Sequence, residues 1–348
     1  MDDFAKLQKW NLIPERTYDI AFLCWLIDSI NHPDEEPEIR SAAEALLDLI
    51  LQEERPERYK SVDIIRGYRK VMAIAVINDS IAVILDTGLI RLELLKTVVE
   101  VKAGLKQGEL PAFLIPFSSV HAAVFDLRYR ENGIGKDAIA GSVDAVILPE
   151  DLLSCMCAQS TPSSKIYNDY LVYLEGFCEK RAGCQRENVA QWDRFCYCGY
   201  FAHLEKQMPQ AGTGWGYKNT AYGLQRWFCW TPPIDEDANT FSPTELEENL
   251  VRLYYQIETV GGVCELRVQC KAAAKKKVAT DFLWEVYRAF SEAFREKGYV
   301  CEKKRFLGGQ FTPVCSVAFE PAEQGDIIEV VNGIYQTVVS KLIAEKIK

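Results

Sequence analysis

Two charged side chains, Lys70 and Asp86, fall at the open end of a predicted β-hairpin, where their types could do chemistry. Carboxylate oxygens are the ligands that a hard cation such as Mg²⁺ prefers, and an ammonium group attracts phosphate oxygens. Met72 and Gly88 share the expected face and supply neither a hard ligand nor a charge. This end of the hairpin is therefore the candidate catalytic site, with Asp86 and Lys70 as its charged groups.

The hairpin is predicted by two runs rich in Val, Ile and Ala that flank the tripeptide Asn78-Asp79-Ser80. Asn, Asp and Ser tolerate the backbone angles of a tight turn. With these three residues as the loop, Ile77 pairs with Ile81, and Ile74 with Ile84. Counting outward then places Met72 opposite Asp86 and Lys70 opposite Gly88. Because side chains alternate along a strand, we expect these last four residues to line one face.

The stretch resembles the active-site hairpin of the PD-(D/E)XK nuclease superfamily, which carries an Asp, an apolar strand, an Asn-Asp turn, a second apolar strand and Glu-x-Lys. In this chain the metal-binding Asp falls on Met72, the Glu on Asp86 and the Lys on Gly88. In active members the two carboxylates hold Mg²⁺ and the Lys helps to position the attacking water. The resemblance thus implies a vestigial site in which two of these groups are missing.

A thioether is a soft, uncharged ligand, so Met72 cannot replace an Asp that binds Mg²⁺. With Asp86 alone, the ion would be held mostly by water, and we expect no metal site and no cofactor. The alternative is a divergent Mg²⁺-dependent endonuclease in which Asp63, Glu44 or Asp19 converges on Asp86. For Asp63 the sequence favours a solvent-facing position on an edge strand.

Apolar periodicity and helix start signals predict the elements around the hairpin. In the first half we expect helices at 19–30, 39–53 and 92–103, strands at 61–66 and 112–117, and a helix that begins near 148–151. Helix, hairpin, helix, strand and helix is the order of the nuclease core. The predicted fold class is mixed α/β (α+β), with a restriction-endonuclease-like core at residues 1–160.

Residues 161–348 are predicted to form a C-terminal α/β extension. Helices are expected at 165–174, 189–206, 281–297 and 327–348, and strands at 253–257, 263–270 and 311–319. Four pieces, in order, resemble one branch of the superfamily that carries such an extension: Tyr170-Leu171-x-Tyr-Leu, Trp192, Tyr254–Glu258 and Lys304-Arg305-Phe306. The resemblance implies that the extension packs on the core.

Composition is that of an ordinary globular protein, with 48% apolar and 26% charged residues among 348. The formal net charge of −10 argues against a surface tuned as a whole to hold a polyanion. The start of the chain lacks the features of a signal peptide, and no apolar run approaches the length of a membrane span, so we expect a cytoplasmic protein without membrane contact. Its twelve cysteines are interpreted as reduced thiols.

Two further clusters could bind ligands. Lys275, Lys276 and Lys277, together with Lys304 and Arg305, would form a nucleic-acid-binding groove if they converge. A zinc site is the other possibility, from residues that fall in one window: Cys178, Cys184, Cys196, Cys198 and His203. Their spacing lacks Cys-x-x-Cys, and buried thiols are the favoured interpretation.

Three functions are compatible with these patterns. The favoured hypothesis is a catalytically inactive nuclease-fold protein that acts by binding, with a protein partner preferred over nucleic acid because of the acidic charge balance. Relatives in this superfamily are common in phages and bacterial immunity, so the resemblance implies a role in that conflict. The alternatives are the divergent endonuclease, which would need Mg²⁺, and a nucleic-acid-binding protein that does not cleave.

Overall fold

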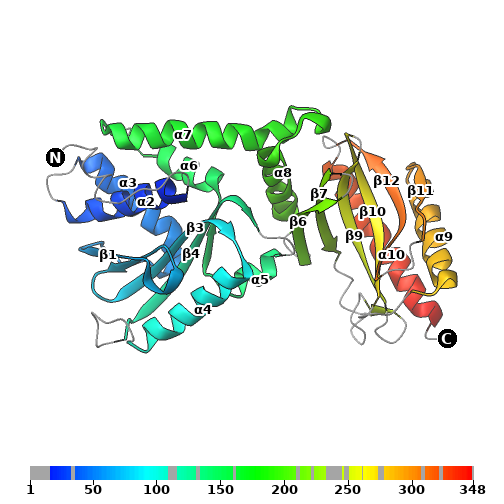
Figure 1. Cartoon of the computed structure of the whole chain (residues 1–348), viewed down its shortest axis with the longest axis horizontal. Coiled ribbons are helices and arrows are strands. Elements are labelled where there is room, and N and C mark those ends of the chain that lie inside the picture. The colour runs from blue at the N-terminus through cyan, green and yellow to red at the C-terminus, as the bar shows by residue number, and fades with distance from the viewer. Residues whose placement is uncertain are drawn as a thin grey trace. The chain divides into compact units, whose positions relative to one another are not determined.

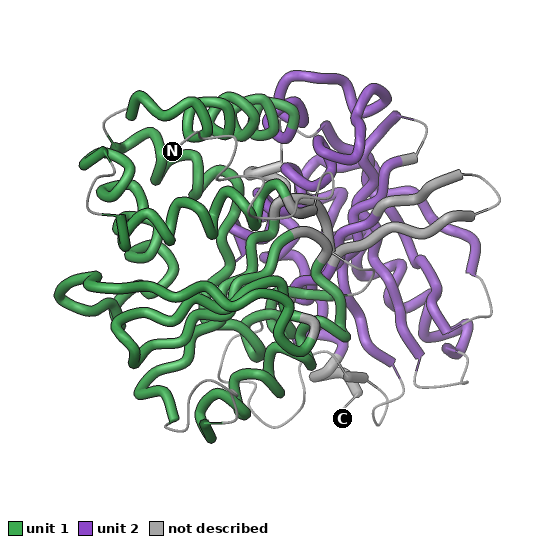
Figure 2. Tube along the Cα trace, turned by 60° about the vertical axis from the view of Figure 1, so that its left-hand side comes forward, with its two compact units in different colours: residues 1–180 green, residues 181–348 purple. Residues whose placement is uncertain are grey.

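The chain forms two compact units, residues 1–180 and 181–348 (Figure 2). The computed structural model describes residues 16–32, 36–108, 116–130, 134–159, 162–208, 212–220, 223–232, 245–246, 251–260, 262–272, 278–306, 310–320 and 324–346. Each unit contains one β-sheet and several helices (Figure 1). The predicted mixed α/β class is therefore confirmed.

The first unit is built on a five-stranded sheet. Its strands, in order across the sheet, are β1 (Val62–Arg66), β2 (Ala73–Ile77), β3 (Ile81–Ile90), β4 (Ser119–Arg130) and β5 (Ala145–Ile147). Its helices are α2 (Arg16–Asp28), α3 (Pro37–Leu51), α4 (Leu92–Lys106), α5 (Lys136–Ala140), α6 (Pro149–Cys157) and α7 (Lys165–Ala182). The strands from β1 to β3 are antiparallel neighbours, whereas β3, β4 and β5 run parallel.

Different helices cover the two faces of this sheet (Figure 1). Alternate residues of a strand point to opposite faces, so neighbouring positions enter different cores. Val83 and Phe125 pack in the core beneath α2, α3, α6 and α7. Ile84 and Val124 pack in the core beneath α4. The sheet is thus buried on both sides, which accounts for the nearly continuous apolar runs of its strands.

The predicted hairpin pairing is confirmed along the β2–β3 ladder, where Ile77 pairs with Ile81 and Ile74 with Ile84. Asn78 and Asp79 take positive φ angles of 49° and 55°, which Asn and Asp tolerate better than most residues. The Asn78 side chain also fixes the segment before β1. Its Oδ1 accepts from the backbone N–H of Lys60 at 2.7 Å, and its Nδ2 donates to the carbonyl of Arg58 at 2.8 Å.

Replacing Asn78 with alanine should therefore destabilise the first unit by about 1–2 kcal/mol, because it removes these hydrogen bonds and strains the turn. Asn78→Asp keeps the acceptor oxygen and the tolerance of positive φ, so it should lose less stability than Asn78→Ala. Urea unfolding of the two variants checks the order. An alanine variant as stable as the aspartate variant would contradict this role for the side chain.

Helix α7 belongs to the first unit, although the sequence analysis placed residues after 160 in the extension. Tyr170 stacks on Phe22 of α2, with ring centroids 3.7 Å apart and an interplanar angle of 7°. The Tyr170 hydroxyl donates to the buried carboxylate of Asp19 at 3.2 Å. The two compact units accordingly divide between residues 180 and 181, after most of this helix.

The strand expected at 112–117 is not present at residues 116 and 117, the part of this range that the structure describes. Residues 112–115 lie outside the described ranges, while Pro116 and Phe117 precede the strand. The strand β4 begins at Ser119 and pairs with β3 from Ile81 onward. Its run contains His121 and Asp126, polar residues that weaken the apolar signal on which the prediction relied.

The second unit is built on an antiparallel sheet in the order β11-β12-β10-β9-β7-β6, with β8 beside β9. Its strands are β6 (Gly212–Thr220), β7 (Gly223–Thr231), β8 (Glu245–Leu246), β9 (Val251–Val260), β10 (Val263–Ala272), β11 (Cys301–Lys303) and β12 (Phe311–Phe319). Its helices are α8 (Arg194–Gln207), α9 (Thr280–Glu296) and α10 (Gln324–Lys346). The three strands and the helices expected at 281–297 and 327–348 are confirmed, with small shifts at their ends.

The helix expected at 189–206 is broken. Val189–Gln191 form one 3₁₀ turn, and α8 starts only at Arg194. Asp193 caps α8, because its carboxylate accepts from the backbone N–H of Phe195 at 2.8 Å and of Cys196 at 3.0 Å. An N-cap residue has non-helical backbone angles, so the cap separates the two segments.

One face of the second sheet is packed by aromatic residues against the helices. Phe228 of β7 contacts Phe201 of α8, with ring centroids 5.7 Å apart. Tyr255 of β9 contacts Phe290 of α9 and Tyr335 of α10 at 6.1 and 5.4 Å. These rings explain why the sequence of this half is rich in buried aromatic residues.

No helix in the described part of the chain combines the length and the apolar character needed to cross a bilayer.

Candidate functional site

The candidate site lies where the parallel strands β3 and β4 end. Asp86 of β3 pairs with Val124 of β4, and Asp126 follows two residues later on the same face. Both carboxylates are buried, with exposed fractions of 5% and 4%. The carboxyl ends of parallel strands meet at one edge, a common place for binding sites in α/β sheets. The register between the two strands also shifts directly after Thr87, and such irregularities often lie beside functional sites.

Asp126 was not found by the sequence analysis. Its signal is a carboxylate near the end of a second strand beside the hairpin, and the misplaced strand at 112–117 hid it. Asp86 was found, because the local hairpin pattern fixes its position.

Asp86 accepts a hydrogen bond from the main chain just before the neighbouring strand β2. The backbone N–H of Met72 donates to its Oδ2 at 3.3 Å. A hydrogen bond to the charged form stabilises a buried carboxylate, so the N–H offsets part of the cost of burying Asp86. Residues 72 and 86 are therefore close, as predicted, but the contact is between the Met72 backbone and the Asp86 side chain.

The prediction that the Met72 side chain shares a face with Asp86 is wrong. Met72 packs with the core beneath α2, whereas the alternation of β3 places Asp86 on the α4 face. The hydroxyl of Thr87 lies on the Met72 side and donates to the thioether sulfur at 3.4 Å. The sulfur therefore lies across the sheet from the carboxylate, and does not stand in the place of a second metal ligand beside it.

The cause of this reversal is the irregular backbone before β2. The ladder with β3 begins at Ala73, so Met72 lies outside the strict alternation. Gly67 and Arg69 take positive φ angles of 62° and 44° in the tight turn that precedes it. Lys70 ends that turn, and its side chain is outside the described part of the structure. Gly88 lies in β3 at the register shift.

The carboxylates proposed as migrated ligands are placed elsewhere. Asp63 is exposed on the edge strand β1 and pairs with Val76, as the favoured interpretation predicted. Glu44 accepts a hydrogen bond from Arg40 within the same helix, α3. Asp19 accepts from Tyr170. Within the described ranges, no three His, Cys, Asp or Glu side chains are grouped so that they could hold a metal ion, and this includes the cysteines considered for zinc.

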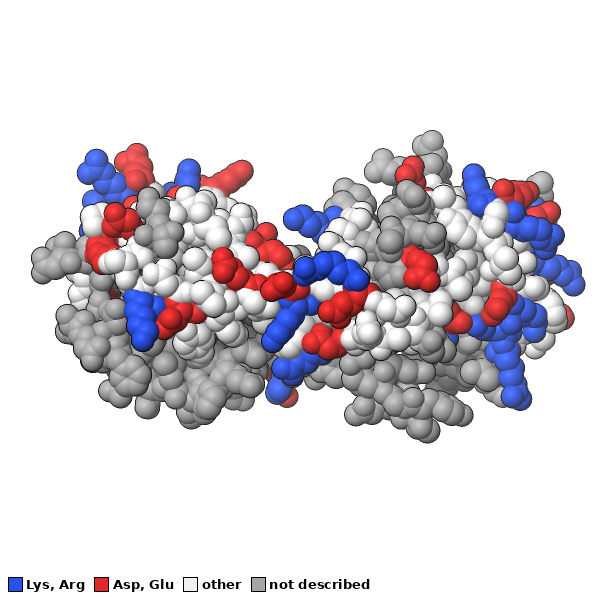
Figure 3. All heavy atoms as spheres, turned by 90° about the horizontal axis from the view of Figure 1, so that it is seen from above, with Lys and Arg blue, Asp and Glu red and all other residues white. Residues whose placement is uncertain are grey.

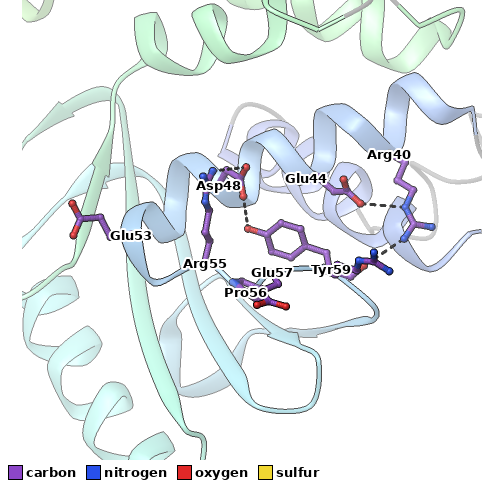
Figure 4. A pocket seen from close by; sticks show the side chains of 9 residues that line it. Arg40, Glu44, Asp48, Glu53, Arg55, Pro56, Glu57 and Tyr59 are labelled. Carbon is purple, nitrogen blue, oxygen red and sulfur yellow. Dashed lines mark hydrogen bonds and ion pairs between the residues drawn. The ribbon is translucent and has the colours of Figure 1, made fainter.

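A polar hollow of about 790 Å³ lies beside α3 and the segment that follows it (Figure 4). Asp48 accepts from the Tyr59 hydroxyl at 2.8 Å and from Arg55 at 2.9 Å. Burial, and then the hydrogen bond to Asp48, raises the pKa of Tyr59. Glu44 and Arg40 form a second pair on the same wall. These charges neutralise one another, and the lining offers little apolar surface, so the hollow lacks the usual character of a small-molecule site.

Ser119, His121 and Glu54 form a polar cluster near the start of β4. The Nε2 atom of His121 lies 2.9 Å from both the Ser119 hydroxyl and a Glu54 carboxylate oxygen. A nucleophilic triad uses two different ring nitrogens, one for the serine and one for the acid. Because both partners here meet the same nitrogen, the cluster does not have triad geometry.

The predicted basic groove is tested only at its second segment, since Lys275, Lys276 and Lys277 lie outside the described residues. Lys304 forms ion pairs with Glu265 at 3.1 Å and with Glu302 at 3.7 Å. Lys304 is therefore already engaged by carboxylates. Arg305 is exposed.

The chain was compared with protein-family models, with curated proteins and with solved structures, and none of the three comparisons gave a match.

Proposed function

We propose that this chain is a catalytically inactive protein with a PD-(D/E)XK nuclease-like core, and that it acts by binding a protein partner. The observation that carries the proposal is the arrangement of the Asp86 carboxylate and the Met72 side chain. Its carboxylate accepts from the Met72 main chain, while the Met72 thioether is turned to the opposite face and bonded by Thr87. The one carboxylate of the motif thus accepts a hydrogen bond from the main chain, and position 72 presents no second ligand on its face.

The order of elements supports the nuclease-like part of the proposal. Helix α3, the β2–β3 hairpin, helix α4, strand β4 and helix α6 occur in this order, with β1 inserted before the hairpin and α5 and β5 inserted before α6. Helix, hairpin, helix, strand and helix is the order that the resemblance implies. The carboxyl end of β3, where the motif acid would lie, also adjoins the next parallel strand.

Electrostatics favours a protein over a nucleic acid as the partner. The formal net charge is −10, and basic side chains lie next to acidic ones on the face shown in Figure 3. Lys304, expected to contact phosphates, is held by Glu265. Affinity for a polyanion depends on Lys and Arg that are available to phosphates, so these pairings lower it. By the resemblance, the proposed setting is conflict between phages and bacteria.

The test is to incubate the pure chain with single- and double-stranded DNA and RNA, at low salt, with Mg²⁺ and separately with Mn²⁺. We expect no cleavage, and Asp86→Ala should behave like the unaltered chain. Cleavage that depends on metal and is abolished in Asp86→Ala would establish the divergent endonuclease instead.

The same mixtures examined by gel retardation distinguish the third function. Retention that weakens steeply with salt, and is lost when Lys275, Lys276 and Lys277 are changed to glutamate, would identify a nucleic-acid-binding protein. We expect no retention. Chemical cross-linking in extracts of a cell that contains the chain, followed by identification of the linked protein and its reconstitution from pure components, then tests the proposed partner directly.

A further inference from the structure

Two thiols of the second unit lie diagonally across two neighbouring strands. Cys301 pairs in register with Val317, and Lys303 pairs with Cys315, in the antiparallel ladder between β11 and β12. Residues directly opposite each other share a face, and so do residues two apart in one strand. Cys301 and Cys315 are therefore diagonal neighbours on one face, and each is the first influence on the pKa of the other.

The surroundings make the two sulfurs unequal. Cys301 is half-buried on the edge strand β11, whereas Cys315 is fully buried. The pKa of Cys301 is lowered, first by the hydrogen bond from Cys315, against the opposing effect of burial, and then by Ser291 and Arg295 of α9. The pKa of Cys315 is raised by the same hydrogen bond and by its burial. The half-buried Cys301 is therefore the sulfur that a small oxidant can reach, and the buried Cys315 beside it is the one that can resolve the oxidised sulfur.

Other cysteines provide the contrast. Burial raises the pKa of Cys24 and of Cys264 to about 12, which makes them unreactive thiols. Cys155 of α6 is half-buried like Cys301, but its pKa is raised, first by burial and then by Asp48. Exposure alone therefore does not single out Cys301.

We propose that Cys301 and Cys315 form a dithiol that responds to peroxide, in which hydrogen peroxide oxidises Cys301 and Cys315 resolves it to a disulfide between β11 and β12. This goes beyond the binding function proposed above and does not depend on it.

The chemistry balances in two steps. The Cys301 thiolate attacks one peroxide oxygen, an S–O bond forms, the O–O bond breaks, and hydroxide leaves and takes up a proton to become water. The Cys315 sulfur then attacks the sulfenic sulfur. An S–S bond forms, the S–O bond breaks, and the departing hydroxide leaves as water with the Cys315 proton. Two thiols are oxidised and one peroxide is reduced, with two waters as products.

The consequence is local to the edge of the second sheet. The strand β11 is only three residues long and pairs with β12 alone among the described strands. Lys303 of β11 also lies over the rings of Trp284 and Phe306, with its Nζ 4.5 and 4.3 Å from their centroids. A disulfide would tie this strand and its aromatic contacts to the interior of the sheet.

The experiment treats the reduced full-length chain with hydrogen peroxide and maps the cysteines by digestion without reductant and mass spectrometry. We expect a cross-linked peptide that joins Cys301 to Cys315. In Cys315→Ser, dimedone should trap a sulfenic acid at Cys301, and Cys301→Ser should yield no cross-link. Cys155→Ser is the matched control, and it should cross-link as the unaltered chain does.

A second measurement uses the unaltered chain alone. Before oxidation, iodoacetamide should label Cys301 faster than Cys155, because the thiolate is the nucleophile and the pKa of Cys301 is lowered whereas that of Cys155 is raised. Equal labelling rates would overturn the proposal, as would peroxide treatment that leaves Cys301 and Cys315 unlinked.

Discussion

A fragment that ends at residue 160 should fail to fold, whereas a fragment that ends at residue 182 should form a stable, cooperative unit. The shorter fragment stops at the boundary that the sequence suggested, and the longer one includes all of α7 (Lys165–Ala182). The difference between them is helix α7 with the segment that leads into it. Circular dichroism and urea unfolding of both fragments measure the result.

The size of the effect follows from what α7 buries. Four of its side chains, Ile166, Tyr167, Tyr170 and Leu174, lie in the core beneath α2, α3 and α6. Burying a large apolar side chain contributes about 1.5–3 kcal/mol, so the four together contribute roughly 6–12 kcal/mol. Whole domains are stable by only about 5–15 kcal/mol. Loss of α7 therefore removes most or all of the stability of the first unit.

Point variants of the longer fragment give the matched control. Tyr170→Ala should cost about 3–5 kcal/mol, because it leaves a cavity against Phe22 and removes the donor to Asp19. Val172→Ala lies on the same helix but is 67% exposed, and its effect should stay within about 0.5 kcal/mol. A cooperative fragment 1–160, or equal losses in the two variants, would mean that α7 is not part of this core.

The boundary between the two units shows which features a local sequence pattern predicts and which it does not. The helix itself was predicted, since the aromatic and apolar residues around Tyr170 recur with helical spacing. Which core that face enters depends on Phe22, which is far away in the sequence, and no local pattern contains this information. The hairpin was predictable for the opposite reason, because Asn78 and Asp79 determine its turn and its register without distant residues.

The candidate site divides in the same way. Asp86 is located by counting along the hairpin, and the structure places it beside the Met72 backbone as that counting requires. The direction of the Met72 side chain departs from that counting because Met72 lies in a bend just before β2, where strict alternation does not hold. Asp126 was missed because it joins Asp86 only through the parallel pairing of β3 with β4, a contact between strands separated by a whole helix.

Replacing Arg267 with methionine should destabilise the second unit by about 3 kcal/mol near neutral pH. Arg267 of β10 hydrogen-bonds Glu258 of β9 and, at 2.9 Å, Glu265 of its own strand. The three side chains are only 18%, 10% and 17% exposed. Breaking a buried ion pair on one side typically costs about 3–5 kcal/mol, because a desolvated charge is left behind. We expect a cost at the lower end of this range, about 3 kcal/mol, since Lys304 still pairs with Glu265.

The loss should shrink as the pH falls. Burial opposes ionisation of Glu265, but the hydrogen bonds from Arg267 and Lys304 outweigh it and hold its pKa below the ordinary 4.5. A lowered pKa in the folded state stabilises the protein above the unfolded value, and this stability is lost as the pH falls through the folded value. For Glu258, burial raises the pKa despite Arg267, so its ionised form already costs stability at neutral pH.

Without Arg267 the pKa values of both carboxylates should be higher than in the unaltered chain. Protonation should then remove the uncompensated charges, and the loss of stability in Arg267→Met should shrink as the pH approaches roughly 4. Hydrogen exchange of residues 251–272, measured at neutral and at acidic pH, follows the loss within this unit. The control adds Glu258→Gln and Glu265→Gln to Arg267→Met, which removes the uncompensated charges and should restore much of the stability. A loss that persists unchanged at low pH, or in this triple variant, would show that Arg267 acts by packing its side chain and not by its charge.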